Sequence, residues 1–136
     1  MLGTFQQSNL RIEVEASEVA IRESLLRPSQ LQKWLWPQQF SPGLPEQFQT
    51  GMRFTSSIGP VTIQHYVDVA ESNCLRFLLS QGIDGFHEWY WGEGWIQSRL
   101  EGISVIPLNL GQTINLVRLK DFLSHQKKVV TNSPAS

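Results

Sequence analysis

The sequence predicts one α+β domain in which an antiparallel sheet of six or seven strands packs against a long C-terminal helix. Two observations carry this prediction. Residues 109–128 form the one long helical pattern in the chain, with three leucines on a single face. The residues before it alternate between apolar and polar in runs separated by turn residues, as in a meander of hairpins. A chain of 136 residues has the size of one domain, which we place at 1–128, followed by a disordered tail at 129–136.

The N-terminal part predicts a strand followed by two short helices. Apolar and charged residues alternate over 10–15, in a strand that begins as early as Thr4. Ser17 can cap a helix that Pro28 interrupts. Pro28 suits the first turn of a second short helix, which ends before Pro37.

The middle of the chain predicts three strands after an irregular loop. Residues 37–46 contain three prolines and a glycine, which is typical of a loop. A strand follows over 48–55, and the Gly-Pro pair at 59–60 indicates a tight connection. Residues 61–69 alternate most regularly, and after a Ser-Asn turn the same pattern returns over 74–79.

The aromatic stretch before the helix leaves two alternatives. Residues 82–85 indicate a connection, and residues 86–100 then form either one long strand with a bulge at its glycines or two short strands joined by a turn at 92–94. We favour one bent strand. The Glu-Gly pair at 101–102 predicts a turn into a last strand over 103–108.

The C-terminal helix has signals at both ends. Asn109 can serve as the N-cap, and Gln112 can reach back to it in a capping box. Lys127 and Lys128 lie in the last turn, where positive charge suits the helix dipole. The predicted apolar face consists of Leu116, Leu119 and Leu123, widened by Ile114, Val117 and Phe122.

Composition argues against several classes of function. Eleven basic and twelve acidic side chains leave a net charge of −1, which supplies no reason to expect a nucleic-acid partner or an anionic membrane surface. The chain has no apolar run long enough to span a bilayer and no signal-peptide pattern. The single cysteine, Cys74, excludes an internal disulfide and fits a reducing compartment. We therefore expect a cytoplasmic protein without integral membrane association.

The sequence offers no metal or cofactor motif. Three scattered histidines and one cysteine provide no pair at metal-ligand spacing. The glycines at 92 and 94 lie between strand-like aromatic residues and do not open a helix, so they do not resemble a phosphate-binding loop. We expect no metal and no cofactor.

The order of elements and several local phrases resemble the helix-grip fold of the START-related superfamily, often called SRPBCC. The resemblance covers the chain up to about residue 128. The similar phrases are Ala16-Ser-Glu-Val, Pro28 to Trp34 with Pro37, Gly51-Met-Arg-Phe, Ile58-Gly-Pro, Glu101-Gly and Leu119-Lys-Asp-Phe-Leu.

The resemblance implies a curved sheet that wraps the terminal helix and leaves an apolar cavity between them. Members of the superfamily use this cavity for lipids, sterols, hormones or polyketides. Some are cyclases or hydrolases, others carry lipids or quinones, and others activate protein chaperones. Because one fold serves so many functions, the function has to be argued from the residues that face the cavity.

Three functional hypotheses follow, and the sequence leaves open whether the protein is an enzyme. The leading one is a carrier or sensor of a small hydrophobic molecule. The second is an enzyme of the cyclase or dehydrase kind, with His65 as acid or base and Tyr66, Glu88 or Arg76 as helpers. The third is a protein-interaction module, for which a protein partner would bind a groove or the outer face of the sheet.

His65 is the one titratable residue that shares the strand face of its neighbouring valines and isoleucine, so it is a candidate for a ligand contact. Large rings line a pocket or fill a core, and both interpretations stay open for the aromatic residues. Trp34 and Trp36 lie where the superfamily places a lid over the cavity mouth. The predicted ligand-binding residues are Trp34, Trp36, Phe54, His65, Phe77, Trp89, Trp91, Leu116 and Leu119.

Overall fold

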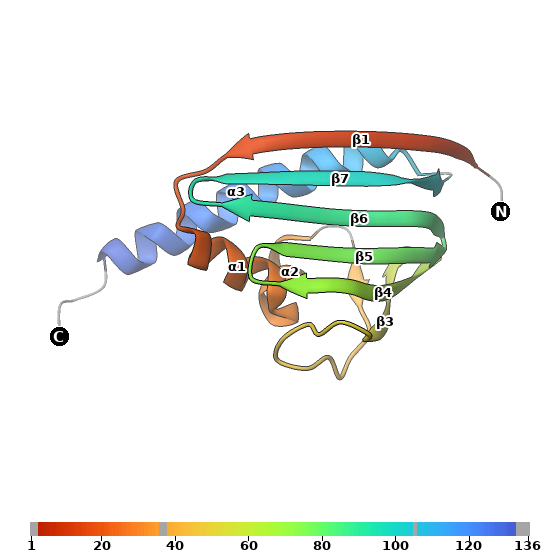
Figure 1. The fold of residues 1–136 in the computed structure, drawn as a ribbon, viewed down its shortest axis with the longest axis horizontal. Helices are drawn as coiled ribbons and strands as arrows, with labels where there is room; N and C mark the ends of the chain where they lie inside the picture. Colours follow the sequence, from red (N-terminus) through yellow and green to blue (C-terminus); the bar gives the residue numbers. More distant parts are fainter. Residues whose placement is uncertain (1–2, 36–37, 105, 133–136) are drawn as a thin grey trace.

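The computed structural model describes residues 3–35, 38–104 and 106–132. Its elements lie in the predicted order (Figure 1). They are β1 (Thr4–Glu13), α1 (Glu18–Leu26), α2 (Pro28–Trp34), β2 (Gln39–Phe40), β3 (Arg53–Ile58), β4 (Val61–Glu71), β5 (Cys74–Gln81), β6 (Ile83–Gly92), β7 (Trp95–Ser104) and α3 (Leu108–Asn132). The predicted α+β class is therefore confirmed.

The described strands form one sheet of seven antiparallel strands in the order β1-β7-β6-β5-β4-β3-β2. Consecutive strands from β2 to β7 are neighbours, as in a meander. β1 closes the other edge, where it pairs with β7 from Thr4↔Ser104 to Glu13↔Trp95. The first and last strands of the chain are thus joined over their whole length.

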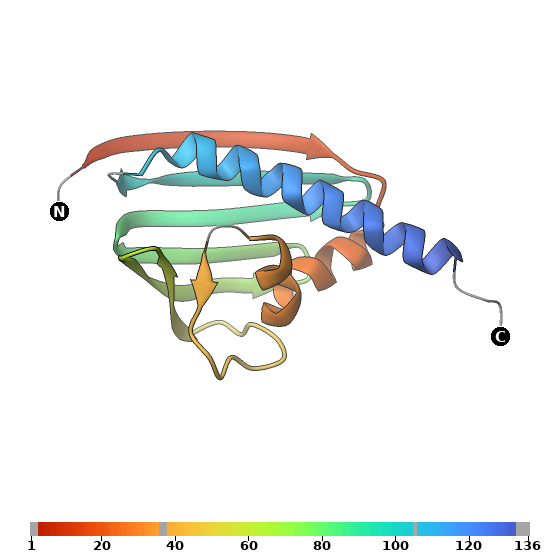
Figure 2. The same ribbon diagram turned by 180° about the vertical axis from the view of Figure 1, so that it is seen from behind.

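The helices lie on one face of this sheet (Figure 2). Ser17 caps α1, since its Oγ accepts a hydrogen bond from the Ala20 amide at 3.1 Å. Pro28 opens α2. Proline has no amide hydrogen, but an amide in the first turn of a helix has no hydrogen-bond acceptor within the helix, so nothing is lost there. α3 crosses the edge of the sheet formed by β1 and β7, and α1 packs beside β6. The predicted helix boundaries at Ser17 and Pro28 are confirmed.

The start of α3 differs from the predicted capping box. The helix begins at Leu108, whose amide donates to Gln6 Oε1 at 2.9 Å, so a side chain of β1 caps it. Asn109 Nδ2 donates to Ser8 Oγ instead of capping the helix. Such a cap joins residues far apart in the chain and leaves no local sequence pattern. At its other end α3 runs past Lys128 to Asn132, and residues 133–136 lie outside the described part.

The turns near the aromatic stretch also differ from the prediction. The single bent strand over 86–100 is wrong, because Glu93 and Gly94 form a tight turn between β6 and β7. Gly94 has a φ of +76°, which a glycine adopts without strain. The alternative with a turn at 92–94 is correct, although both strands are long.

Two glycines predicted in turns lie inside strands. Gly85 is in β6 and Gly102 is in β7, where they pair with each other. A Cβ atom on Gly85 would lie 1.9 Å from the backbone oxygen of Glu101, so these glycines permit a close approach of two backbones. The actual turn before β6 is at Gln81 and Gly82, and Gln81 has a φ of +73°.

Two smaller differences concern the first half of the sheet. The predicted loop at 37–46 contains the two-residue strand β2, which pairs with β3. The strand predicted over 48–55 begins only at Arg53, because the preceding Gly51 has a φ of +95° and the chain turns there.

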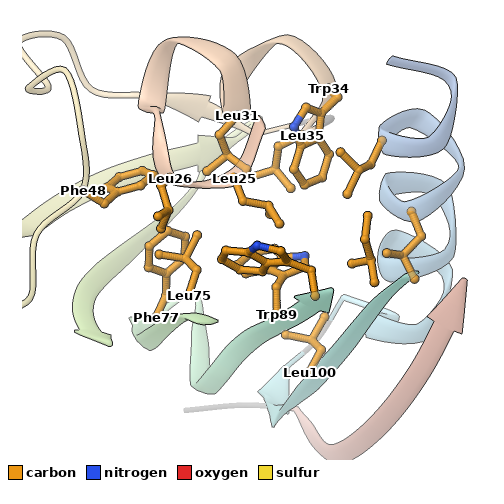
Figure 3. Packing of buried hydrophobic residues seen from close by; sticks show 14 of the residues in the cluster. Leu25, Leu26, Leu31, Trp34, Leu35, Phe48, Leu75, Phe77, Trp89 and Leu100 are labelled. Atoms are coloured by element: carbon orange, nitrogen blue, oxygen red, sulfur yellow. The ribbon is translucent and has the colours of Figure 1, made fainter. Parts of the chain in front are cut away.

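The core lies between the helices and the inner face of the sheet (Figure 3). Leu116, Leu119 and Leu123 of α3 are buried, as predicted. Val117 does not belong to the apolar face, because it is 63% exposed. The fully buried large side chains include Trp34, Trp89, Trp91, Phe48 and Phe77.

Candidate functional site

The inner face of the sheet carries a continuous run of aromatic rings. The rings of Phe54 and His65 are stacked, with centroids 4.6 Å and planes 4° apart. Phe77 meets His65 edge-on at 5.3 Å and Trp89 at 5.6 Å. Trp89 in turn meets Trp34 of α2 edge-on at 6.5 Å (Figure 3). The fold thus brings these five predicted residues together from four strands and a helix.

The other predicted residues have different surroundings. Trp91, Leu116 and Leu119 are buried, with 1%, 2% and 0% of their surface exposed. Leu116 and Leu119 belong to the face of α3 that packs on the sheet. Trp36 lies outside the described residues.

His65 is a polar residue in apolar surroundings. Its side chain is 3% exposed, and its Nε2 lies 2.7 Å from the hydroxyl oxygen of Ser56. Burial lowers the pKa of His65 from 6.5 to about 3, because a charged imidazolium would lose its hydration there. The ring is therefore neutral at physiological pH, with one nitrogen protonated and one bare.

A second polar group links the sheet to α3. Gln112 Nε2 donates to the Ser98 carbonyl at 2.9 Å and to Ser98 Oγ at 3.0 Å. His87 Nε2 lies 3.2 Å from the same Ser98 Oγ. Burial, with a smaller contribution from repulsion by His65 in its protonated form, lowers the pKa of His87 to about 3. The inner face thus contains two buried, neutral histidines, each beside a serine.

Three buried polar atoms between the inner face of the sheet and α3 have no hydrogen-bond partner among the described residues. They are His65 Nδ1 on β4, Trp91 Nε1 on β6 and Gln112 Oε1 on α3. In folded proteins the large majority of buried polar side-chain atoms are paired, so each one calls for an explanation. An unpaired buried polar group costs about 1–3 kcal/mol, which a ligand atom or a water molecule would offset.

The helpers considered for an enzymatic His65 lie on the opposite face. Glu88 alternates with the inward residues of β6, and its carboxylate lies 3.4 Å from Arg76 and 3.8 Å from Arg99. Arg76, Glu88 and Arg99 lie opposite one another on the neighbouring strands β5, β6 and β7. Tyr66 also points outward, where Arg53 lies over its ring at 5.2 Å. The described part of the chain therefore brings no second titratable helper from this set to His65.

Sequence reasoning missed the polar partners on the inner face. Ser56 shares the strand face of Phe54, and Ser98 lies between the buried Ile96 and Leu100 positions of its face. A serine at an apolar position of an alternating strand is the signal that could have identified both. Gln112 lies four residues before Leu116 and hence on the same helix face.

The described residues also bear on a metal site, a nucleophilic cysteine and a membrane-spanning helix. No group of three His, Cys, Asp or Glu side chains among the described residues could hold a metal ion. Burial is the largest of the causes that raise the pKa of Cys74 to about 11, so its thiol is a poor nucleophile. No helix among residues 3–35, 38–104 and 106–132 is long and apolar enough to cross a membrane.

Hollows bordered by described residues lie between α1 and α3, between α2 and α3, beside α2 and beside the β3-β4 pair. One of about 360 Å³ lies between α1 and α3 and includes Ala20, Arg27 and Phe122. Another of about 280 Å³ borders His65 and Phe54, but most of its lining comes from residues of the outer face, such as Arg53 and Gln64. We assign neither hollow to the group of aromatic rings and buried histidines on the inner face of the sheet.

No protein-family model matches the chain, and no curated protein matches it in sequence. Solved structures match its fold. A protein from Chromobacterium violaceum has 16% sequence identity and a TM-score of 0.70, over 86% of this chain and 96% of its own. The Aha1 dimer from Colwellia psychrerythraea has 18% identity and a TM-score of 0.62, over 87% and 96%. DynU16, a protein of the dynemicin biosynthetic locus, has 17% identity and a TM-score of 0.67 over 88% of this chain, which covers only 48% of DynU16.

Proposed function

Because the chain has the helix-grip fold of the START-related superfamily, we propose that it binds and carries a small hydrophobic molecule between α3 and the inner face of the sheet. The single observation that carries this proposal is the surroundings of His65. A protein that needs only a packed core gains nothing from a buried imidazole whose Nδ1 has no partner among the described residues. A bound molecule with one polar atom would offset that cost and would be enclosed by the rings of Phe54, Phe77 and Trp89.

A carrier agrees with this geometry better than a cyclase or dehydrase does. General acid-base catalysis works best when the pKa of the catalytic group lies near the operating pH. The pKa of His65 is about 3, so the group is a weak base at neutral pH. Tyr66, Glu88 and Arg76 lie on the other face of the sheet and offer it no assistance.

The test is native mass spectrometry of freshly purified protein, followed by organic extraction and identification of the bound molecule. Leu79 pairs with His65 across β4 and β5 and points inward, whereas the adjacent Leu78 is 38% exposed on the outer face. Leu79→Phe should displace the bound molecule, and the matched control Leu78→Phe should retain it. Protein that is free of any molecule, and that also fails to bind the neutral fluorescent probe N-phenyl-1-naphthylamine, would contradict the proposal.

A second candidate, self-association through the outer face, rests on a separate observation. Leu78, Tyr90 and Ile103 are 38%, 41% and 36% exposed on neighbouring strands β5, β6 and β7. Aromatic and apolar side chains beside arginines are typical of protein interfaces. The Aha1 structure from Colwellia psychrerythraea is that of a dimer. Sedimentation velocity should then show a dimer that Tyr90→Ser weakens, and a monomer at every concentration would exclude this candidate.

A further inference from the structure

We infer that the bound molecule presents a hydrogen-bond acceptor, such as a ketone or quinone oxygen, to an N–H group at Nδ1 of His65, and that Ser56 is the positioning residue that keeps the hydrogen on that nitrogen. This inference rests on the proposed function and specifies the chemistry of its ligand.

The first step is that the imidazole ring is held in one orientation. Phe54, its partner across the β3-β4 ladder, stacks on it with planes 4° apart. Phe77 and Phe40 meet it edge-on at 5.3 Å and 6.2 Å. Rings packed on three sides prevent rotation, so the direction of each nitrogen is set by the fold.

The second step concerns which nitrogen carries the hydrogen. Ser56 is 2% exposed, and its hydroxyl makes one hydrogen bond among the described residues, to His65 Nε2. If Nε2 donated, the buried hydroxyl hydrogen of Ser56 would be left without an acceptor. If Ser56 donates, its hydrogen is paired, and the neutral ring carries its own hydrogen on Nδ1. The second arrangement leaves fewer unpaired groups and is therefore favoured.

The third step concerns the kind of ligand atom to which Nδ1–H can donate a hydrogen bond. The ring is neutral and offers one donor at this position, so the matching atom is an acceptor. A carboxylate would also accept, but its charge would be buried among Phe40, Phe54 and Phe77 without a cation. A neutral carbonyl oxygen on an otherwise apolar molecule meets both conditions.

The tautomer can be tested without any ligand. In ¹⁵N-labelled protein, long-range ¹H–¹⁵N spectra distinguish the protonated nitrogen of each imidazole from the bare one. We expect His65 to be protonated at Nδ1, and we expect Ser56→Ala to give a mixture of tautomers. Ser57→Ala is the matched control, since Ser57 is the adjacent serine on the other face of β3, and it should change nothing. A wild-type ring protonated at Nε2 would overturn the inference.

The ligand chemistry is tested with two flat molecules of nearly the same shape, 9-fluorenone and fluorene, which differ in a carbonyl oxygen. In the wild type, the hydrogen bond from Nδ1–H of His65 to the carbonyl oxygen should make fluorenone bind about tenfold more tightly than fluorene, as measured by calorimetry. His65→Phe keeps the stacked ring and should reduce this ratio to near one. Equal affinities in the wild type would overturn the inference while the proposed function stands. If neither molecule binds and the purified protein carries none, both fail together.

Discussion

Acidification should destabilise the protein well above the pH at which carboxylates become protonated, because its two buried histidines resist protonation. The pKa values of His65 and His87 are lowered to about 3 by burial, from 6.5 in the unfolded chain. Above pH 6.5 both states are neutral at these residues, and the stability is fully present. As the pH falls from 6.5 towards 3, only the unfolded state gains the protons, so the free energy of unfolding decreases.

The magnitude follows from this difference in pKa. Below pH 6.5, each histidine lowers the free energy of unfolding by about 1.4 kcal/mol per pH unit. Between pH 7 and pH 5 this amounts to about 2 kcal/mol for each histidine. The two together predict a loss of about 4 kcal/mol, which is a large part of the stability of a domain of this size. A shift of this kind should be visible as a lower midpoint of urea unfolding.

The assay is urea unfolding at pH 7, 6 and 5 for the wild type and for His65→Phe. The comparison uses only the change with pH, so any difference in stability at pH 7 does not affect it. The variant keeps His87 and should lose about 2 kcal/mol over this range, half of the wild-type loss. Equal losses in the two proteins, or no loss between pH 7 and pH 5, would refute the assignment of His65 as a buried neutral residue.

Three further predictions concern the helix and the sheet. Leu119→Asp should abolish the folded circular dichroism spectrum, because Leu119 is fully buried and a charge would have no partner there, whereas Val117→Asp on the exposed side of the same helix should melt near the wild-type temperature. Gly85→Ala should lower the free energy of unfolding by more than about 2 kcal/mol in urea titrations, since its Cβ would lie 1.9 Å from a backbone oxygen; stability equal to wild type would disprove the close approach. Gly111→Ala should instead raise it by about 0.5–1 kcal/mol, since no described atom beyond its own turn of the helix lies within 4 Å of the new Cβ and alanine favours a helix; a lower stability would count against this.

The sequence by itself determined most of the element order. Alternation over 61–69 predicted β4, and local signals at Ser17 and Pro28 predicted where α1 and α2 begin. These signals act within a few residues of the chain, through a hydrogen bond to a nearby amide or a fixed backbone angle. The burial of Leu119 was predictable for the same reason, because helical periodicity is a local property.

Only the tertiary structure decided the roles of Gly85, Gln112 and Ser56. A glycine in a sequence indicates either a turn or a close approach, and only the pairing of β6 with β7 shows which applies to Gly85. Gln112 bonds Ser98, fourteen residues away in the chain, and Ser56 meets His65 across a strand pair. Such hydrogen bonds depend on the register between strands and on where a helix crosses a sheet. The physical reason is that register and crossing are set by packing of the whole core, to which no short stretch of sequence corresponds.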